Sequence, residues 1–498
     1  MKLRILYFII MAAFFASGCK KSYLDSKPSE YLSTIHLAEA AKTDPGLLEG
    51  NIAGLYSTMY NTGTGGTDLD HDDFGQKGYD IYTDMLQSDM VLAGLNYGWY
   101  SNLARYNATI DYTRNENYKP WRYYYRIVFG ANNVIDALGG TDVVPESDEQ
   151  KHIMGQAKGM RAYAYFYLAQ LFSKGYNESE KILPIYTNTE VPNQPKSTAK
   201  EVYDLIIDDL TEAISYLETF ERATKDQVDK WVAKGLLAYV LSARGTNADL
   251  QQVVTLTNEI TGEFSLTSKK ATVLDIAAGE TVATNSEAGF NNIATPSWIW
   301  GVDLTLANGL DLVSWWGQVD YYTYSYAWAG DPKTIDRGLF DAIRSDDIRK
   351  KQFHSTLRPL YKFFDPGRTA GGQRNIITDY VYMRADEFVL LNAEANARLG
   401  QTTDARNSLK KLLELRLTDY SYVDNLSGDA LLNEVYLQTR IELWGEGKAY
   451  LAMKRLKKDV KRGSNHLFSA NATIPYDDAK LTFSIPQAEV LNNPNLNK

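Results

Sequence analysis

Apolar positions recur at the spacing of amphipathic helices along most of the chain. Such stretches follow Pro45 and run over residues 121–137 and 148–172. Thr198 and Glu201 have the pattern of a capping box, which marks the start of another helix. Because the helical period persists over most of the chain, we predict a mainly α-helical fold.

Two segments within this pattern resemble each other. Residues 233–260 and 387–417 each indicate a helix rich in small residues, a turn at a glycine (Gly245 or Gly400) and a second helix. This order is similar to the tetratricopeptide unit, a helical hairpin of ~34 residues. Such hairpins bury their apolar faces only by stacking, which builds a solenoid with a concave surface.

The helical period fades in two long stretches, residues 61–114 and 261–380. Gly, Asn, Thr, Trp and Tyr dominate the second stretch, where only residues 335–345 predict a helix. Long insertions of this kind in a helical scaffold usually carry function. We therefore predict that the ligand-binding face lies in these loop-rich stretches.

The N-terminus has the layout of a secretory signal peptide. Lys2 and Arg4 precede an apolar run over residues 5–15, and small residues then lead to Cys19, the only cysteine in the chain. The run is shorter than the ~20 residues of a membrane-spanning helix. Because the whole pattern resembles a bacterial lipoprotein signal, we predict a signal peptide over residues 1–18 and a lipidated N-terminus and tether over residues 19–45. An ordinary signal peptide with a chance cysteine is the alternative.

Composition narrows the classes of partner. Loss of residues 1–18 leaves 50 basic against 62 acidic residues, so the formal charge of −10 becomes −12. Nucleic-acid binding requires a broad positive field, and we expect no nucleic-acid partner. With its one cysteine lipidated, the chain has no thiol left for a disulfide.

Aromatic residues are abundant and mostly of the amphipathic kind. The chain has 35 Tyr and 9 Trp against 17 Phe. Tyr and Trp combine an apolar ring with a polar edge, which predicts aromatic surface that is partly exposed to water. Tyrosines at the rims of helix packing are the alternative.

Two aromatic clusters in the loop-rich stretches are candidates for the ligand site. Flat rings stack on the apolar C–H faces of sugars, while polar side chains bond to the hydroxyl groups; peptides use the same rings and add backbone hydrogen bonds. The alternative for each cluster is a local core within the loop. The second cluster, which starts at Trp315, also includes Tyr321, Tyr326 and Trp328. The predicted ligand-binding residues are Asn96, Tyr97, Trp99, Tyr100, Trp315, Trp316, Tyr322 and Tyr324.

Several stretches resemble the SusD/RagB family of nutrient-uptake lipoproteins. They occur in family order and cover nearly the whole mature chain. These stretches are RAYAYFYLAQLF (161–172), EVYDLIIDDLTEAISYL (201–217), residues 334–350, YVYMRADEFVLLNAEANARLG (380–400), RIELWGEGKAYLAMKR (440–455) and IPQAEVLNNPNL (485–496).

The resemblance implies a SusD-like fold, in which tetratricopeptide-like helical hairpins carry long loop-rich insertions that form the ligand face. It implies a binding protein without enzymatic activity or cofactor. Its expected partner is a SusC-like TonB-dependent transporter, which the protein covers as a hinged lid on the exterior of the outer membrane. The expected ligand is an oligosaccharide or, as in RagB-like members, an oligopeptide. The motif residues Arg161, Glu387, Arg440 and Glu446 are expected to form packing contacts or ion pairs.

We expect residues 46–498 to form a single SusD-like domain. Its helical scaffold would comprise residues 46–260 and 381–460, with the loop-rich insertion over 261–380 and a C-terminal tail over 461–498.

Two other functional classes stay open. A lipid-anchored glycoside hydrolase on a helical scaffold needs two carboxyl groups ~5–10 Å apart, for which Asp320 and Asp331 near the tryptophans are candidates. A repeat scaffold that binds only proteins is the second. Release of reducing sugar would favour the first, and tight protein pairing without a small ligand would favour the second.

No metal site is predicted. The acidic run from Asp68 to Asp73 alternates like a calcium loop, but Asp73 and Tyr79 stand where an EF-hand needs glycine and glutamate. We interpret this run as a solvated acidic loop. The five histidines lie far apart and form no zinc-binding motif.

Overall fold

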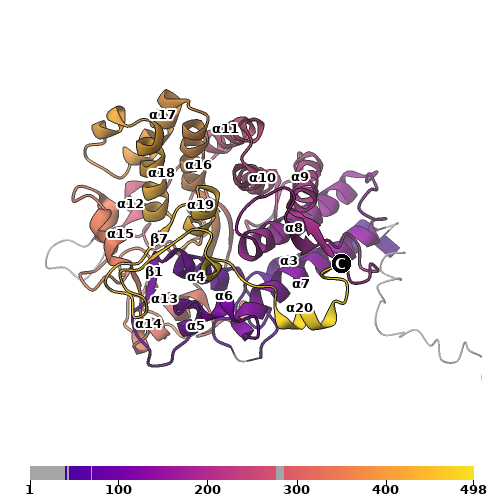
Figure 1. The fold of residues 1–498 in the computed structure, drawn as a ribbon, viewed down its shortest axis with the longest axis horizontal. Coiled ribbons are helices and arrows are strands. Elements are labelled where there is room, and N and C mark those ends of the chain that lie inside the picture. The colour runs from indigo at the N-terminus through magenta and orange to yellow at the C-terminus, as the bar shows by residue number, and fades with distance from the viewer. Residues whose placement is uncertain (1–39, 42–43, 69, 276–284) are drawn as a thin grey trace, which may run out of the picture.

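A computed structural model describes residues 40–41, 44–68, 70–275 and 285–498 of the chain. The described part is mainly α-helical, as the sequence predicts (Figure 1). The predicted signal peptide, Cys19 and most of the predicted tether lie outside the described residues.

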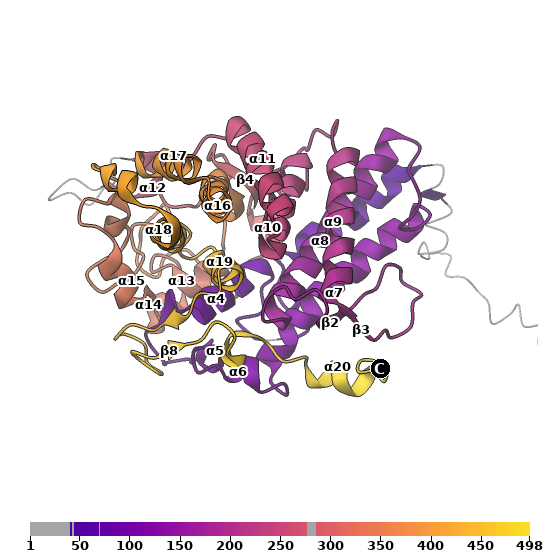
Figure 2. The same ribbon diagram turned by 45° about the horizontal axis from the view of Figure 1, so that its top comes forward.

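The long helices stack on one another in a continuous series. α7 packs on α8, α8 on α9, α9 on α10, α10 on α11, and α11 on α16, which also contacts α17 and α18 (Figures 1 and 2). The helices of this scaffold are α3 (Glu49–Thr58), α7 (Asn115–Ala137), α8 (Asp148–Phe172), α9 (Ala199–Tyr216), α10 (Lys230–Arg244), α11 (Asn247–Glu263), α16 (Ala385–Arg398), α17 (Thr402–Leu413), α18 (Gly428–Glu442) and α19 (Ala449–Arg455).

Both predicted helical hairpins are present. α10 ends at Gly245 and α11 follows it, while Gly400 lies between α16 and α17. The capping box at Thr198 also forms, because its side chain accepts from the backbone N–H of Glu201, whose carboxylate accepts from the N–H of Thr198. The structure therefore confirms both hairpins and the capped start of α9.

The longest helix in the stretch over residues 61–114, which the sequence predicted to be irregular, is α4 (Gln76–Gln87). All twelve of its residues are buried. Several of its polar side chains are bonded inside the protein; Lys77, for example, pairs with Asp80 at 2.8 Å. The polar and apolar residues of α4 do segregate at helical spacing, and its polar side chains find their partners inside the protein.

Short elements occupy the loop-rich parts. In the described part of the chain, four two-stranded sheets pair β1 with β5, β2 with β3, β4 with β6 and β7 with β8, all antiparallel. The strands are β1 (Met90–Leu92), β2 (Lys181–Pro184), β3 (Lys196–Thr198), β4 (Trp298–Val302), β5 (Lys333–Ile335), β6 (Tyr380–Arg384), β7 (Val460–Lys461) and β8 (Thr473–Ile474). The short helices are α5 (Ser101–Ala104), α6 (Asn107–Ile110), α12 (Lys269–Thr272), α13 (Trp315–Val319), α14 (Tyr326–Ala329), α15 (Arg337–Ala342) and α20 (Gln487–Asn492). α15 confirms the helix predicted within residues 335–345.

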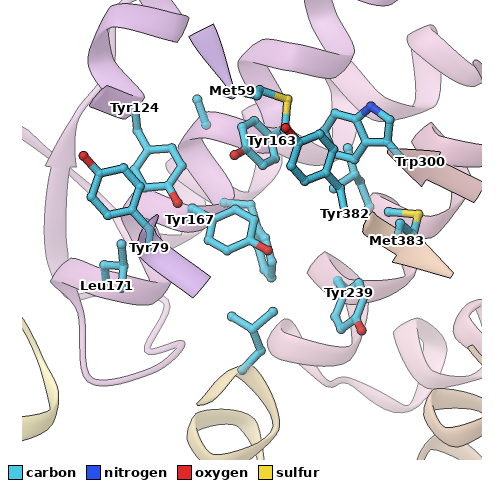
Figure 3. Packing of buried hydrophobic residues seen from close by; sticks show 14 of the residues in the cluster. Met59, Tyr79, Tyr124, Tyr163, Tyr167, Leu171, Tyr239, Trp300, Tyr382 and Met383 are labelled. Carbon is cyan, nitrogen blue, oxygen red and sulfur yellow. The ribbon is translucent and has the colours of Figure 1, made fainter. Parts of the chain in front are cut away.

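Many tyrosines lie in the core, and the predicted exposed aromatic surface is much smaller than their number indicated. Tyr79, Tyr124, Tyr163 and Tyr167 gather between α4, α7 and α8, all buried (Figure 3). The Tyr124 hydroxyl donates to the side-chain oxygen of Gln76 at 3.0 Å. Internal partners of this kind let a phenol lie in the core, so the count of tyrosines says little about surface.

A buried ionic network joins β6 to the last helices of the scaffold. Glu442 accepts from Arg384 at 2.9 Å and from Arg349 and Arg416 at 3.0 Å each. Burial by itself raises the pKa of Glu442, but the guanidinium groups of Arg416, Arg384 and Arg349 hold that pKa well below its usual range. The carboxylate is therefore charged and fully paired.

Candidate functional site

A pair of short strands brings the two predicted aromatic clusters together. β1 pairs antiparallel with β5, so that Leu92 lies opposite Lys333. Antiparallel pairing places the end of one strand beside the start of the other. Residues 93–100, which follow β1, therefore lie beside residues 320–332, which precede β5.

Asp331 fastens the first loop to the second. Its buried carboxylate accepts hydrogen bonds from the backbone N–H groups of Asn96, Tyr97 (2.9 Å) and Gly98 (2.8 Å). The Asn96 side chain donates to the carbonyl oxygen of Ala329 at 3.0 Å. Because one carboxylate satisfies three successive N–H groups, the loop that carries Tyr97 is held in one conformation.

Two glycines let these loops touch. A Cβ atom on Gly94 would lie 1.9 Å from the carbonyl oxygen of Gly330. A Cβ atom on Gly330, whose φ is +114°, would lie 2.0 Å from the side-chain nitrogen of Asn96. A side chain at either position would push the loops apart, so the crossing requires glycine at both.

The joined loops present an aromatic face, defined here as Tyr97, Trp99, Tyr324, Tyr326 and Trp328. Tyr97 is 60% exposed and Trp328 is 43% exposed, whereas Tyr326 is buried among them. The Tyr326 ring lies 5.0 Å from the Tyr97 ring and 6.5 Å from the Trp99 ring, between centroids. The Tyr324 ring lies 5.7 Å from that of Trp328. Offset and tilted rings at these separations stabilise one another.

His71 supports the aromatic face from a third segment. Its imidazole stacks on the Trp99 ring with centroids 5.1 Å apart and an interplanar angle of 4°. Its Nδ1 atom is hydrogen bonded to the Tyr326 hydroxyl. Burial raises the pKa of Tyr326, so this phenol stays protonated at neutral pH. The Trp99 ring is thereby fixed before a ligand arrives.

A polar ladder, defined here as the hydrogen bonds that link Lys333, Gln318 and the backbone of His71, lies beneath His71. Lys333 donates from Nζ to Gln318 Oε1 at 2.7 Å, and Gln318 donates from Nε2 to the His71 carbonyl oxygen at 2.7 Å. Lys333 is fully buried, and that burial lowers its pKa to about 7. This ladder connects β5 to the segment that carries His71.

A polar cleft of about 480 Å³ opens beside Trp99. Its side chains are held by short contacts: Asn102 donates to Glu116 at 2.6 Å, and Arg114 pairs with Asp111 at 3.0 Å. Carboxylates, amides and cations next to a flat ring are the groups that bind sugar hydroxyls while the ring covers an apolar sugar face. The lining residues are Asp70, Trp99, Asn102, Asp111, Thr113, Arg114, Asn115, Glu116 and Lys119.

Five of the predicted ligand residues lie at the surface of these loops. Asn96 is exposed beside Tyr97, and Trp99, Tyr322 and Tyr324 are half-buried. The Tyr322 hydroxyl accepts a hydrogen bond of 2.6 Å from a guanidinium that also lies 4.2 Å from the ring centroid, so this tyrosine is already partnered within the protein.

The other three predicted residues lie in the core, which corrects the prediction for them. Tyr100 is 3% exposed, and Trp315 and Trp316 are each 1% exposed. The Trp315 ring packs against that of Phe363, with centroids 4.6 Å apart, and against Trp316 at 5.1 Å. Close packing leaves no ring face for a ligand, so the alternative of a local core holds at these positions.

Several residues of the site were not predicted from the sequence. His71 was assigned to an acidic run, and the cleft residues Asn102, Arg114 and Glu116 have no local motif. Tyr326 and Trp328 belong to the second predicted cluster, although they were not among the predicted ligand-binding residues. The others could be found only by knowing which segments meet.

The acidic run next to His71 is bonded within the protein, and its interpretation as a solvated loop is wrong at its end. Asp72 and Asp73 are 2% and 0% exposed. Lys119 pairs with Asp70 at 3.0 Å and with Asp72 at 2.5 Å, while Asp73 accepts from the Gly65 N–H at 2.8 Å. Within the described residues, no group of three or more His, Cys, Asp or Glu side chains is arranged to hold a metal ion.

The two carboxyl groups considered for hydrolysis are also enclosed. Asp320 is 1% exposed, and its carboxylate accepts from the Thr323 hydroxyl at 2.7 Å and from the Tyr322 N–H at 3.0 Å. Burial raises the pKa of Asp320 to about 7. Asp331 is 0% exposed and fastens the loop described above. Both groups therefore hold loops in place.

Two family profiles match the chain in succession. Residues 74–241 match a profile described as "Starch-binding associating with outer membrane", and residues 320–498 match one described as "SusD family". The chain belongs to the SusD/RagB family. This agrees with the resemblance found in the sequence motifs.

Curated SusD relatives are distant in sequence. A SusD-like protein, P38, from Formosa agariphila is 23% identical over 398 residues, which cover 69% of this chain and 73% of the relative. A SusD-like protein from Bacteroides ovatus is 28% identical over 175 residues, which cover 30% of each chain.

Solved SusD structures match the whole architecture. A SusD-like carbohydrate binding protein from Bacteroides vulgatus is 25% identical, with a TM-score of 0.71, and the match covers 91% of this chain and 97% of that one. Surface glycan-binding protein A from Bacteroides thetaiotaomicron has a TM-score of 0.63 at 15% identity, covering 90% and 97% of the two chains, and shows likeness of fold.

The SusD motif residues have the structural roles expected of them. Arg161 pairs with a buried aspartate at 2.7 Å, and Arg440 pairs with Asp89 at 2.6 Å. Glu446 pairs with an arginine at 2.7 Å, and Glu387 accepts from a tyrosine hydroxyl at 2.5 Å. The prediction of packing and ion-pair roles for these four residues is confirmed.

Proposed function

We propose that this protein is a nutrient-binding lipoprotein that captures an oligosaccharide on its aromatic face. It passes the ligand to a SusC-like TonB-dependent transporter in the outer membrane. It performs no chemistry on the ligand and needs no cofactor. Cys19 carries the lipid anchor, and the folded body faces the cell exterior. Residues 46–498 act as one ligand-binding domain.

One observation carries this proposal: open rings stand beside a polar cleft on loops that are fixed in advance. Tyr97 and Trp328 expose much of their surface, and Trp99 borders the cleft of about 480 Å³. Rings offer sugars a stacking surface, and the cleft offers carboxylates, amides and cations for hydroxyl groups. Because Asp331 and His71 already hold the loop and the Trp99 ring, little ordering cost opposes binding.

Membership of the SusD/RagB family supports the remaining parts of the proposal. One matching profile describes association with the outer membrane, and one similar solved structure is described as carbohydrate binding. Within the described residues, no helix combines the length and apolar character needed to cross a bilayer.

The test is ligand binding by a variant that lacks both open rings of the first loop. We expect the mature protein to bind at least one member of a panel of neutral oligosaccharides, measured by isothermal titration calorimetry. Tyr97→Ala with Trp99→Ala should weaken that binding by about tenfold or more, because each stacking contact contributes ~0.5–1.5 kcal/mol beyond area burial. Trp231→Ala, which removes a partly exposed tryptophan of α10, is the matched control and should bind normally.

Other results would contradict parts of this proposal. Equal affinity of the double variant and the wild type would place the ligand elsewhere. If the protein bound oligopeptides and none of the oligosaccharides, the proposed ligand class would be wrong, but the proposed site would stand. Release of reducing sugar during the titration would show that the protein is an enzyme.

A further inference from the structure

A second groove is lined by α7, by residues 186–191 and by α20. The two helices that border it, α7 and α20, are labelled in Figures 1 and 2. Its volume is about 580 Å³, and it shares no residue with the aromatic face or with the polar cleft. The α7 residues that line it recur at the spacing of one helix face, so α7 presents them together. They are Tyr118, Trp121, Arg122, Tyr125, Arg126, Val128, Phe129 and Asn132.

Aromatic rings form much of the groove. The Trp121 ring is buried, and the Tyr125 ring lies 4.7 Å from it and 5.9 Å from the Tyr186 ring. The Tyr125 hydroxyl donates to the Pro184 carbonyl oxygen at 2.8 Å, which fixes this ring. Phe129 is 56% exposed, so its ring is open to solvent. The groove therefore has both fixed and open rings.

Two arginines that lie one turn apart on α7 line the same groove, and their guanidinium groups have no hydrogen-bond or ion-pair partner among the described residues. Both residues, Arg122 and Arg126, are exposed. The Arg122 stem is held, because a Cβ atom on Gly66 would lie 2.4 Å from its Cδ atom. Unpaired guanidinium groups one turn apart form a positive site on a chain whose net charge is −10.

The opposite wall is polar and carries one carboxylate, that of Glu489, which forms no ion pair with either arginine. Glu489 of α20 accepts a hydrogen bond from the Asn493 side chain at 2.8 Å and has no ion pair within the described residues. Asn188 accepts through its side-chain oxygen from the N–H groups of Glu190 and Val191 at 3.0 Å each. Its amide N–H groups have no partner among the described residues and could donate to a ligand.

We propose that this groove binds an anionic sugar residue, through a carboxylate or sulfate group on the sugar. Arg122 and Arg126 pair with the anionic group, because a guanidinium fork matches the geometry of carboxylate and sulfate oxygens. Tyr125, Tyr186 and Phe129 cover the apolar face of the ring. The preference for an anion follows from the arginines alone, whereas the choice of a sugar rests on the proposed function.

The groove is near enough to the proposed glycan site to receive another part of the same nutrient. α7 lines both: Lys119 borders the polar cleft beside Trp99, and Arg122 borders the groove. These two positions are three residues apart on one helix, about 4.5 Å along its axis. This proximity favours a sugar over an unrelated acidic partner.

The test compares an anionic oligosaccharide with its neutral counterpart on the full mature protein. The probes are tetragalacturonate, the same tetrasaccharide with its carboxyl groups reduced, and a sulfated tetrasaccharide, each titrated by calorimetry at low and high salt. We expect tighter binding of at least one anionic probe than of the neutral one, and weaker anionic binding at high salt.

Variants then locate the anionic group. Arg122→Gln with Arg126→Gln should weaken binding of the anionic probe about tenfold. Lys269→Gln with Lys270→Gln, an exposed pair on α12, is the matched control because it changes the net charge equally and should bind like the wild type. Phe129→Ala, an exposed position that leaves the core intact, should also weaken binding.

The two proposals fail in different ways. If the proposed glycan site is wrong, the Tyr97 and Trp99 double variant will bind the neutral probe as tightly as the wild type does. This outcome is independent of how the arginine variant behaves. The groove proposal would be overturned if neither anionic probe bound, if anionic and neutral probes bound equally, or if the lysine control lost as much affinity as the arginine variant. An acidic peptide that bound in place of both sugars would overturn the choice of a sugar.

Discussion

At the scale of residues, neighbouring aromatic side chains in one loop have opposite environments. Trp99 borders the polar cleft, whereas Tyr100, the next residue, is 3% exposed and packs against Tyr82 with ring centroids 5.7 Å apart. Residue type and position in the loop predict the same exposure for both residues. The burial of each depends on the direction in which the loop turns, and Asp331 sets that direction through three backbone hydrogen bonds.

Lys333 is a single residue whose charge should affect stability. Its pKa is lowered to about 7 by burial, while unfolding returns it to about 10.5. Between these two values the unfolded state binds one more proton, so this group makes the free energy of unfolding rise with pH, by at most ~1.4 kcal/mol per unit. Lys333→Met removes this contribution. We expect the wild type to gain stability relative to the variant as pH rises from 7 to 10.

Denaturant unfolding at several pH values measures this difference. Lys269→Met, at an exposed position of α12, is the control and should keep a constant difference from the wild type. A constant difference for Lys333→Met as well would mean that Lys333 titrates normally in the folded protein.

At the scale of elements, the sequence identified the helices that have one polar face. The hairpins at Gly245 and Gly400 and the capped start of α9 were all predicted from local patterns. α4 was missed although its polar and apolar residues recur at helical spacing, because the residues just before it, from Asn61 to Gly75, are rich in Gly, Thr and Asp. Three-residue strands such as β1 and β5 also escaped, since their pairing joins segments more than 240 residues apart.

The end of α18 shows how much one element depends on its buried charges. Removing one partner of a buried ion pair leaves the others unpaired and costs ~3–5 kcal/mol. Glu442→Gln should lower the free energy of unfolding by about this amount at neutral pH, because Arg349, Arg384 and Arg416 all pair with this carboxylate. Denaturant unfolding measures the change. Glu259→Gln, in an exposed pair with Lys234, should cost under about 1 kcal/mol.

The pH dependence of this effect has a definite sign. The folded-state pKa of Glu442 is held well below its usual value, so its contribution is complete above pH ~4.5 and is lost as pH falls through the folded-state pKa. The stability difference between wild type and Glu442→Gln should therefore shrink in acid. A difference that grew below pH ~4.5 would contradict the charged, paired state.

At the scale of the whole molecule, the helical stack carries two separate surfaces for ligands. The aromatic face lies on loops around β1 and β5, and the groove with Arg122 and Arg126 lies on the outer side of α7. Both surfaces depend on segments that are distant in sequence. The division into a scaffold over residues 46–260 and 381–460, an insertion over 261–380 and a tail over 461–498 stays a proposal.

We predict that a lipid on Cys19 attaches the whole molecule to the membrane. Cys19→Ser should move the protein from the outer-membrane fraction to the soluble fraction, because each buried methylene of an acyl chain contributes ~0.8 kcal/mol to anchoring. Fractionation and mass spectrometry of the mature N-terminus measure this change. Lys20→Ser leaves the cysteine intact and should stay with the membrane. Release of the wild type, with an unmodified thiol, would contradict the lipid anchor.

The sequence by itself determined the helical class, the family and the structural role of motif residues such as Arg161 and Glu446. These properties follow from local periodicity and from short runs of neighbouring residues. Only the tertiary structure decided which aromatic rings are open, since Trp99 is half-buried beside the polar cleft, whereas Trp315, which has the same chemistry, is buried in the core. The reason is that exposure depends on what packs against a ring, and the partners of these rings come from distant parts of the chain.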